Sequence, residues 1–182
     1  MSKRQPFFYD ITLRDGNQSL KKPWNTYEKE IIFNLLVELG VQGVEVGFSA
    51  ASDMDFEACS RLAQIAPNNI VISGLARAVE SDIIKVAQAI EPANKPRIHT
   101  FIAMSPFNMQ YVLNKTPEQV RKIAVEAVEF AKKTIGKRGE VQFSIEHFGD
   151  CHENIDFVID SLQDVVKAGA TGKAAIGYNC GT

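Results

Sequence analysis

The chain has 182 residues, of which 45% are hydrophobic and 23% charged, and its formal net charge is −2. This length predicts one domain with one core, and the nearly neutral charge without a basic block excludes an evident nucleic-acid footprint. Three cysteines without CxxC spacing argue against a disulfide framework and a thiolate zinc site. No apolar run suits a signal peptide or a membrane span, so we expect a cytoplasmic protein with no membrane partner.

Short β-prone runs alternate with longer segments of helical periodicity along the chain. Ser52 and Thr116 fit N-caps, Pro117 fits a first helical position, and Gly40 fits a C-terminal stop. The first helix carries one apolar face of Ile31, Ile32, Leu35, Leu36 and Leu39. In chain order the predicted elements are a strand at Tyr9–Leu13, a helix at 25–40, strand 43–48, helix 52–66, strand 70–75, helix 80–90, strand 97–103, helix 116–136, strand 140–146, helix 153–169 and a sixth strand at 173–178.

Strands separated by helices of this length predict parallel pairing with right-handed crossovers. Two architectures fit the order, a (β/α)8 barrel and an open doubly wound sheet. No GxGxxG follows the first strand, which removes the best marker of a nucleotide-binding Rossmann fold. A complete barrel needs about 250 residues, so this chain supplies only part of one.

Ionisable and polar residues stand within or just after four of the six predicted strands. In parallel α/β folds the functional site lies at the carboxyl ends of the strands. Each residue alone has an ordinary structural explanation, as a turn former, a buried ion-pair partner or a core histidine. Their recurrence at strand ends nevertheless predicts one shared site, and the residues are Arg14, Asp15, Glu45, His99, Thr100, Ser144, Glu146 and His147. Cys151 and Cys180 are expected to be structural, since nothing nearby activates a thiolate.

Four segments resemble one enzyme family. "LRDGNQ" at 13–18, followed by Lys29, closely resembles the N-terminal signature of the 2-isopropylmalate synthase and homocitrate synthase family, within the metal-dependent TIM-barrel group that includes HMG-CoA lyase. "VEVGFSAAS", "RIHTFIAMS" and "FSIEHFGD" resemble that family's second, fourth and fifth strand segments. The resemblance implies an incomplete (β/α)8 TIM barrel with about five and a half β/α units, and it implies an acyltransferase.

The resemblance also implies roles for individual residues. Asp15 is similar to a ligand of a divalent metal, Mg²⁺, Mn²⁺ or Zn²⁺, and Arg14 to the cation that steadies the enolate oxygen. Glu146 is implied as the acid-base residue. Substrate-pocket positions around an α-keto acid and the co-substrate acetyl-CoA are implied for Gln18, Glu45, His99, Thr100 and Ser144. Such roles suit a Claisen condensation, which needs a polarised ketone, a charge stabiliser and a proton acceptor.

The chain departs from this family in two places. The family's His-x-His metal pair is absent, because the three histidines are His99, His147 and His152. The tail at 170–182 does not match the family's sixth strand. We therefore expect residues 1–182 to be the N-terminal portion of a TIM-barrel catalytic domain, a truncated form that lacks synthase activity on its own.

Three readings stay open. The first is a 2-isopropylmalate synthase-like acyltransferase of leucine biosynthesis, and the second is a homocitrate or citramalate synthase. The third is a catalytically inactive interaction fragment. An open half-barrel would expose a strand edge and apolar surface, so we expect a homo-oligomer or association with a completing fragment.

Overall fold

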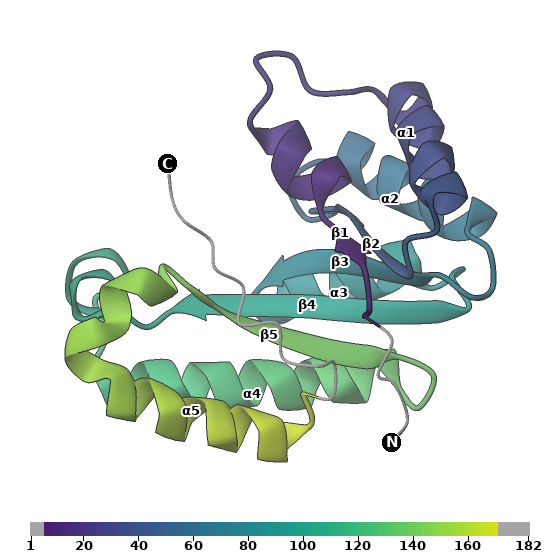
Figure 1. Cartoon of the computed structure of the whole chain (residues 1–182). Coiled ribbons are helices and arrows are strands. Elements are labelled where there is room, and N and C mark those ends of the chain that lie inside the picture. Colours follow the sequence, from purple (N-terminus) through teal and green to yellow (C-terminus); the bar gives the residue numbers. More distant parts are fainter. Residues whose placement is uncertain (1–5, 171–182) are drawn as a thin grey trace. The chain divides into compact units, whose positions relative to one another are not determined.

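The computed structural model describes residues 6–170. The sixth strand predicted at 173–178 lies outside this range, and of the tail at 170–182 only residue 170 lies within it. Five strands within the described residues follow chain order in one sheet (Figure 1). The strands are β1 (Tyr9–Asp10), β2 (Gly43–Gly47), β3 (Val71–Arg77), β4 (Lys95–Ala103) and β5 (Glu140–Glu146). The helices are α1 (Thr26–Leu39), α2 (Asp53–Ile65), α3 (Glu80–Ile90), α4 (Pro117–Ile135) and α5 (Ile155–Ala168), with short helical turns η1 (Thr12–Gly16), η2 (Asn108–Val112) and η3 (Phe148–Asn154).

The strands pair in parallel, as the alternation of strands and helices predicts. β1 pairs with β2 in the register Tyr9↔Gly43, and β2 pairs with β3 in the register Glu45↔Ser73. Parallel neighbours need a crossover connection, which α1 and α2 supply here. The carboxyl ends of β1, β2 and β3 therefore point the same way.

The chain falls into two compact units. The first contains residues up to Leu75 together with Lys85–Arg97, and the second contains Ala76–Ile84 and the residues from Ile98 onward. In the first unit α2 packs against α1 and β2, around a core that includes Phe33, Val44, Val46 and Leu62.

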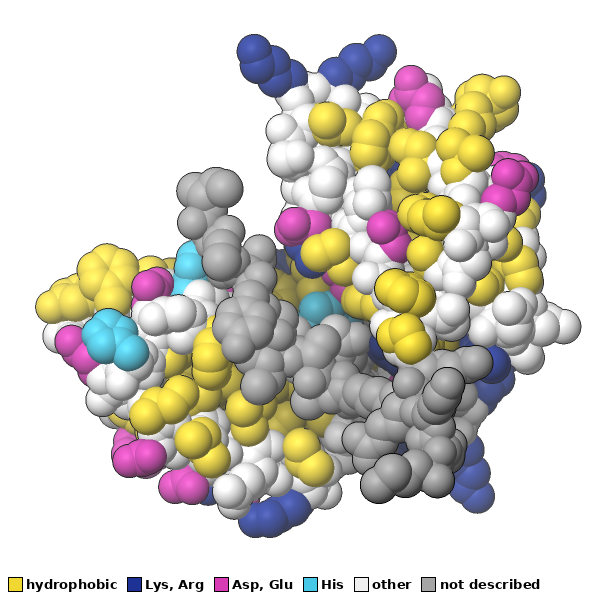
Figure 2. Space-filling model, in the orientation of Figure 1, with side chains coloured by type: hydrophobic (Ala, Val, Ile, Leu, Met, Phe, Trp, Pro, Cys, Tyr) yellow, Lys and Arg dark blue, Asp and Glu magenta, His cyan; other side chains and the backbone are white. Residues whose placement is uncertain are grey.

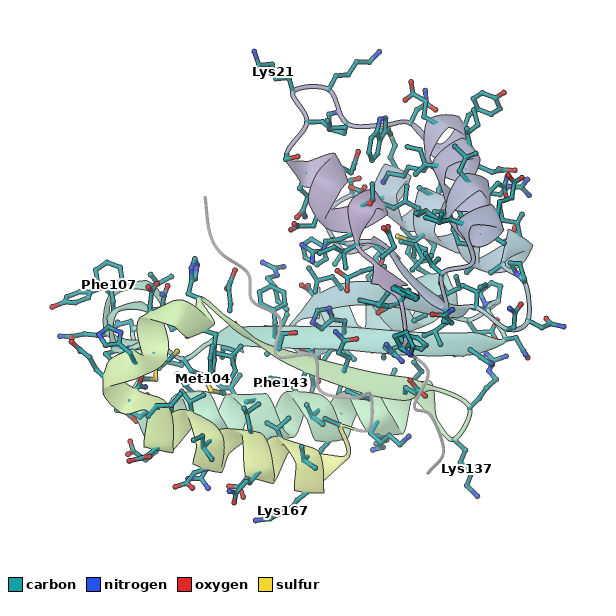
Figure 3. All side chains as sticks on the ribbon, in the orientation of Figure 1. Lys21, Met104, Phe107, Lys137, Phe143 and Lys167 are labelled. Carbon is teal, nitrogen blue, oxygen red and sulfur yellow. The ribbon has the colours of Figure 1, made fainter. Side chains whose placement is uncertain are left out.

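In the second unit α4 packs against α5 and β5 (Figure 1). Val141, Phe143 and Ile145 alternate along β5 and are buried, and Figure 3 shows Phe143 and Met104 on the side of the sheet that faces α4. Because successive residues of a strand point to opposite faces, Ser144 and Glu146 project from the other face.

The predicted helix boundaries are confirmed. Thr116 and Gln119 form a reciprocal capping box at the start of α4, with Pro117 at the first helical position. Ser52 caps α2, where its Oγ accepts from the backbone of Asp55. Gly40 ends α1 in a left-handed conformation with φ of 86°, which glycine adopts without a Cβ penalty.

Two predictions about the N-terminal segment are wrong. The first strand ends at Asp10, because Leu13 and the residues up to Gly16 form the turn η1 instead. The apolar face of α1 is also misplaced, because Phe33 and Lys29 are its buried residues while Ile31 is exposed.

No helix in the described part of the chain is both long enough and apolar enough to cross a bilayer.

Candidate functional site

Arg14 lies at the centre of a buried polar cluster in the first unit. Its Nε donates to Glu45 Oε1 at 2.5 Å, and its Nη1 donates to Asp15 Oδ1 at 2.5 Å. Arg14 is 8% exposed and Glu45 is completely buried. Charged groups are rarely buried without partners, and here the cation and the two carboxylates compensate one another. The structure thus brings together three of the residues that the sequence predicts for the site.

The local chain path places these groups. Asp10 ends β1, and its carboxylate accepts from the backbone N–H of Thr12 at 2.8 Å and from the Thr12 hydroxyl at 3.1 Å. Such a local side-chain bond favours a turn over a continued strand. The turn carries Arg14 toward β2, where Glu45 points away from the face on which Val44 and Val46 are buried.

Tyr9 belongs to this cluster and was not among the predicted residues. Its hydroxyl donates to Glu45 Oε2 at 2.8 Å. Burial, and next the neighbouring Glu45 carboxylate, raise the pKa of the Tyr9 phenol well above its usual value, so this group remains a donor. In the sequence Tyr9 stands only as a residue of the first predicted strand, and nothing there signals its contact with Glu45, 36 positions away.

Asp15 is the one predicted metal ligand, and its side chain is 44% exposed. Oδ1 accepts from Arg14, while Oδ2 has no hydrogen-bond partner among residues 6–170 and is a hard oxygen donor of the kind that binds divalent cations. The described residues contain no group of three or more His, Cys, Asp or Glu side chains that could hold a metal ion. Asp15 therefore fits as a single ligand, and the described residues supply no complete ligand set.

Gln18, a predicted substrate-pocket residue, is exposed just after η1. The neighbouring Asn17 is buried instead, and its Oδ1 accepts from the backbone N–H of Trp24 at 2.8 Å. Lys29, the lysine of the family signature, is 3% exposed and pairs with Asp55 at 3.3 Å. Asn17 and Lys29 thus stabilise the loop and helix that follow the site.

In the second unit His99 and Ser144 are adjacent. His99 Nε2 and Ser144 Oγ share a hydrogen bond of 2.6 Å between β4 and β5, and both residues are buried. Thr100 follows His99 and so projects from the opposite face of β4. Its hydroxyl is buried and has no hydrogen-bond partner within the described residues, so the geometry gives its predicted substrate contact no support.

Glu146, the predicted acid-base residue, ends β5 and is partly exposed. His147 follows with φ of 53°, an uncommon left-handed conformation for a residue with a side chain. This turn directs the chain from β5 into η3. That the residues of β4 and β5 share one site with Arg14, Asp15 and Glu45 stays a prediction.

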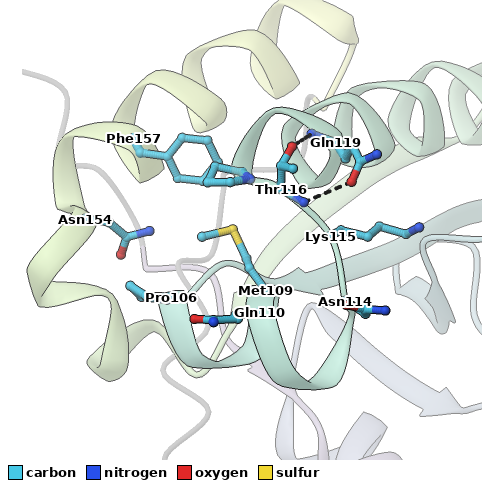
Figure 4. Close-up of a pocket in the computed structure, with 10 residues that line it drawn as sticks. Pro106, Met109, Gln110, Asn114, Lys115, Thr116, Gln119, Asn154 and Phe157 are labelled. Carbon is cyan, nitrogen blue, oxygen red and sulfur yellow. Dashed lines mark hydrogen bonds between the residues drawn. The ribbon is translucent and has the colours of Figure 1, made fainter.

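The second unit also contains a pocket of about 560 Å³ between η2, the start of α4 and α5 (Figure 4). Met109, Pro117 and Phe157 form its apolar wall, with Gln110 and Lys115 at its polar side. None of the predicted site residues lines it.

Cys151 is free and buried, which agrees with its expected structural role, whereas Cys180 lies outside the described residues. Cys59 is also free and buried. Burial raises the pKa of the Cys59 thiol to about 12, which leaves almost no thiolate near neutral pH.

Comparison with known proteins identifies relatives over nearly the whole chain. Residues 5–174 match the HMGL-like family model. A 2-isopropylmalate synthase of Leptospira interrogans is 51% identical over 92% of this chain, and one of Aliarcobacter butzleri is 45% identical over 93%. The alignments cover 39% and 32% of those two proteins, so this chain spans at most about two fifths of their length.

Solved structures show the same fold. An HMG-CoA lyase from Bacillus subtilis has a TM-score of 0.66 at 17% identity, over 90% of this chain and 55% of that one. An HMG-CoA lyase from Acinetobacter baumannii, in complex with coenzyme A and 3-methylmalate, has a TM-score of 0.61 at 16% identity, over 89% and 53%. The predicted fold class, an incomplete TIM barrel, is confirmed, and the chain belongs to the HMGL-like family.

Proposed function

We propose that this chain is the N-terminal portion of a 2-isopropylmalate synthase-like acyltransferase. The whole enzyme would join acetyl-CoA to an α-keto acid in a Claisen condensation of leucine-type amino-acid biosynthesis. The observation that carries the proposal is Arg14, a buried cation fixed between Glu45 and Asp15 on the "LRDG" turn. The 51% identity to a 2-isopropylmalate synthase supports the choice of reaction.

Arg14 has the chemistry that such a condensation needs. A guanidinium stays charged at any working pH and can offset negative charge that develops on a reacting oxygen. Glu45 holds Nε and Asp15 holds Nη1, while Nη2 has no hydrogen-bond partner in the described part of the chain. We assign Nη2 as the donor to a substrate oxygen.

Asp15 would contribute its outer carboxylate oxygen to a divalent cation, Mg²⁺, Mn²⁺ or Zn²⁺. When bound, such a cation would polarise the carbonyl of the α-keto acid. We assign proton transfer from the thioester methyl group to Glu146, whose partial exposure lets it reach a ligand. The polar groups of Glu45, His99 and Ser144, with Gln18 and Thr100 by resemblance alone, are assigned to the substrate pocket.

We place residues 1–182 in one TIM-barrel catalytic domain, of which the tail at 170–182 departs from the family pattern. The proposed setting is the cytoplasm, where acetyl-CoA and α-keto acids are the small-molecule partners. No nucleic-acid or membrane partner is proposed.

A chimera tests this function. The matching segment of the Leptospira synthase is replaced by this chain, and acetyl-CoA-dependent thiol release is measured with α-keto acids of increasing side-chain size. Release with a branched α-keto acid supports a 2-isopropylmalate synthase, whereas a preference for pyruvate or 2-oxoglutarate supports a citramalate or homocitrate synthase. A folded chimera without thiol release contradicts the proposal. The chain alone is expected to release no thiol.

A second candidate role, an interaction fragment, has one observation in its favour. Along α1 the side chains of Tyr27, Ile31, Leu35 and Leu39 recur every four residues and are 72%, 44%, 57% and 78% exposed. Figure 2 shows hydrophobic side chains gathered over this helix. An exposed apolar face of this kind indicates an interaction surface. Association of the purified chain with itself, measured by sedimentation and lost in Leu35→Lys, supports this role, and a monomer at all concentrations contradicts it.

A further inference from the structure

Tyr9 and Arg14 hold the same carboxylate from its two sides. The Tyr9 hydroxyl donates to Glu45 Oε2 at 2.8 Å, and Arg14 Nε donates to Glu45 Oε1 at 2.5 Å. Each carboxylate oxygen thus has its own donor. A carboxylate bonded in this way is fixed in its rotation about the terminal side-chain torsion, which is otherwise broad.

The Tyr9 ring is itself held in place. Its position in β1 is set by the parallel register Tyr9↔Gly43. A Cβ at Gly43 would lie 2.8 Å from the Tyr9 ring, so this glycine leaves the room that the ring occupies. On another side the guanidinium carbon of Arg97 lies 5.6 Å from the ring centre, within the range of a cation–π contact.

The hydrogen bonds continue from Tyr9 to the candidate metal ligand. Tyr9 binds Glu45, Glu45 binds Arg14, and Arg14 binds Asp15. Glu45 is fully buried, so water cannot replace a lost donor without rearrangement. Removing the Tyr9 hydroxyl would take away one of the hydrogen bonds to this buried carboxylate, at the cost that the loss of a hydrogen bond to a charged group carries.

We propose that Tyr9 is a positioning residue, which sets the orientation of Glu45 and, through it, of the Arg14 guanidinium. This inference rests on the proposed function for the role of Arg14 as the donor to a substrate oxygen. The positioning of Arg14 by Tyr9 can be measured without an activity assay. Tyr9 touches no reacting atom in this account. Through Glu45, Tyr9 restricts the Arg14 guanidinium to one orientation.

The test follows the Arg14 Nε–H group by ¹⁵N NMR in the full chain, with the resonance assigned through Arg14→Lys. In Tyr9→Phe this resonance is expected to shift and its hydrogen exchange with water to become about tenfold faster, as the loss of roughly one charged hydrogen bond predicts. Tyr27→Phe is the matched control, because Tyr27 is 72% exposed, and it should leave the resonance unchanged. An Arg14 resonance and exchange rate in Tyr9→Phe equal to those of the wild type would overturn the proposal.

A second measurement uses the wild-type chain, so it can be made even if Tyr9→Phe fails to fold. In an equal mixture of H₂O and D₂O, a slowly exchanging tyrosine hydroxyl gives two separate ¹³Cζ lines. Tyr9 is expected to give two lines and Tyr27 one averaged line. A single averaged line for Tyr9 would overturn the proposal, and neither outcome depends on whether the enzyme is a synthase.

Discussion

Arg14 and Glu45 form a buried ion pair across 31 positions of the chain, with 2.5 Å between Nε and Oε1. Glu45 has no exposed surface, and the Arg14 side chain is 9% exposed. The pair links η1 to β2, two elements that α1 separates along the chain and that pack directly against each other. It is therefore a structural bond as well as the proposed support of the catalytic cation.

Glu45→Gln is expected to destabilise the chain by roughly 3 kcal/mol, because it removes the fully buried one of the two carboxylates that compensate the Arg14 charge. The free energy of unfolding in urea measures this. Glu30→Gln is the control, since Glu30 pairs with the 47% exposed Arg61 and its substitution should cost much less stability than Glu45→Gln. Equal losses of unfolding free energy in the two variants would contradict the expectation that the buried Arg14–Glu45 pair contributes more to stability than the exposed pair.

Gly43→Ala is expected to destabilise the chain by about 1–3 kcal/mol through overpacking against the Tyr9 ring. A Cβ at this position lies 2.8 Å from Tyr9 and 3.2 Å from Phe7. Gly149→Ala is a matched control, because a Cβ there meets nothing within 4 Å. Urea unfolding of both variants checks the prediction, and an unaffected Gly43→Ala would contradict the tight approach of β1 to β2.

Cys59 is expected to make the chain less stable as the pH rises above 9. Burial raises the pKa of its thiol from 9.0 to about 12, so between these values the native state binds a proton that the unfolded state has released. The free energy of unfolding then falls by up to about 1.4 kcal/mol per pH unit. Below pH 9 both states are protonated and the contribution is constant. In Cys59→Ala the slope between pH 9 and 10 should be shallower than in the wild type, and an identical slope would contradict this assignment.

The chain alone is expected to bind Mn²⁺ weakly, because a tight site has several protein ligands and the described residues offer one carboxylate oxygen. Calorimetry should give low-affinity heats that Asp15→Ala abolishes. Asp53→Ala is the control, since the Asp53 side chain is 96% exposed and lies on α2. Tight binding, or heats that survive Asp15→Ala, would contradict the assignment of Asp15.

Much of the fold could be predicted from local signals. The capping box at Thr116 and the glycine stop at Gly40 fix helix ends through bonds between near neighbours, which the sequence displays directly. The alternation of strands and helices was enough for parallel pairing. The choice of a barrel over an open sheet came from the "LRDGNQ" resemblance and not from periodicity.

The errors lie where tertiary contacts decide. α1 is apolar on more than one face, so periodicity alone could not show that Phe33 is buried while Leu35 is exposed. β1 stops early because Asp10 bonds its own backbone neighbour at Thr12, a local competitor that the β-prone residues Ile11 and Leu13 concealed. Tyr9 was missed because its role depends on Glu45, 36 positions away.

We propose above that Arg14, held by Glu45, is the charge-stabilising group of an acyltransferase. Thiol release by the chimera carrying Arg14→Gln tests it most directly, beside Arg61→Gln, which removes a cation from an exposed pair with Glu30. Arg14→Gln is expected to lower the rate by about 10²–10³, the usual loss for one group that stabilises a developing oxyanion, while Arg61→Gln keeps the parent rate. A folded Arg14→Gln chimera as active as its parent would contradict the claim.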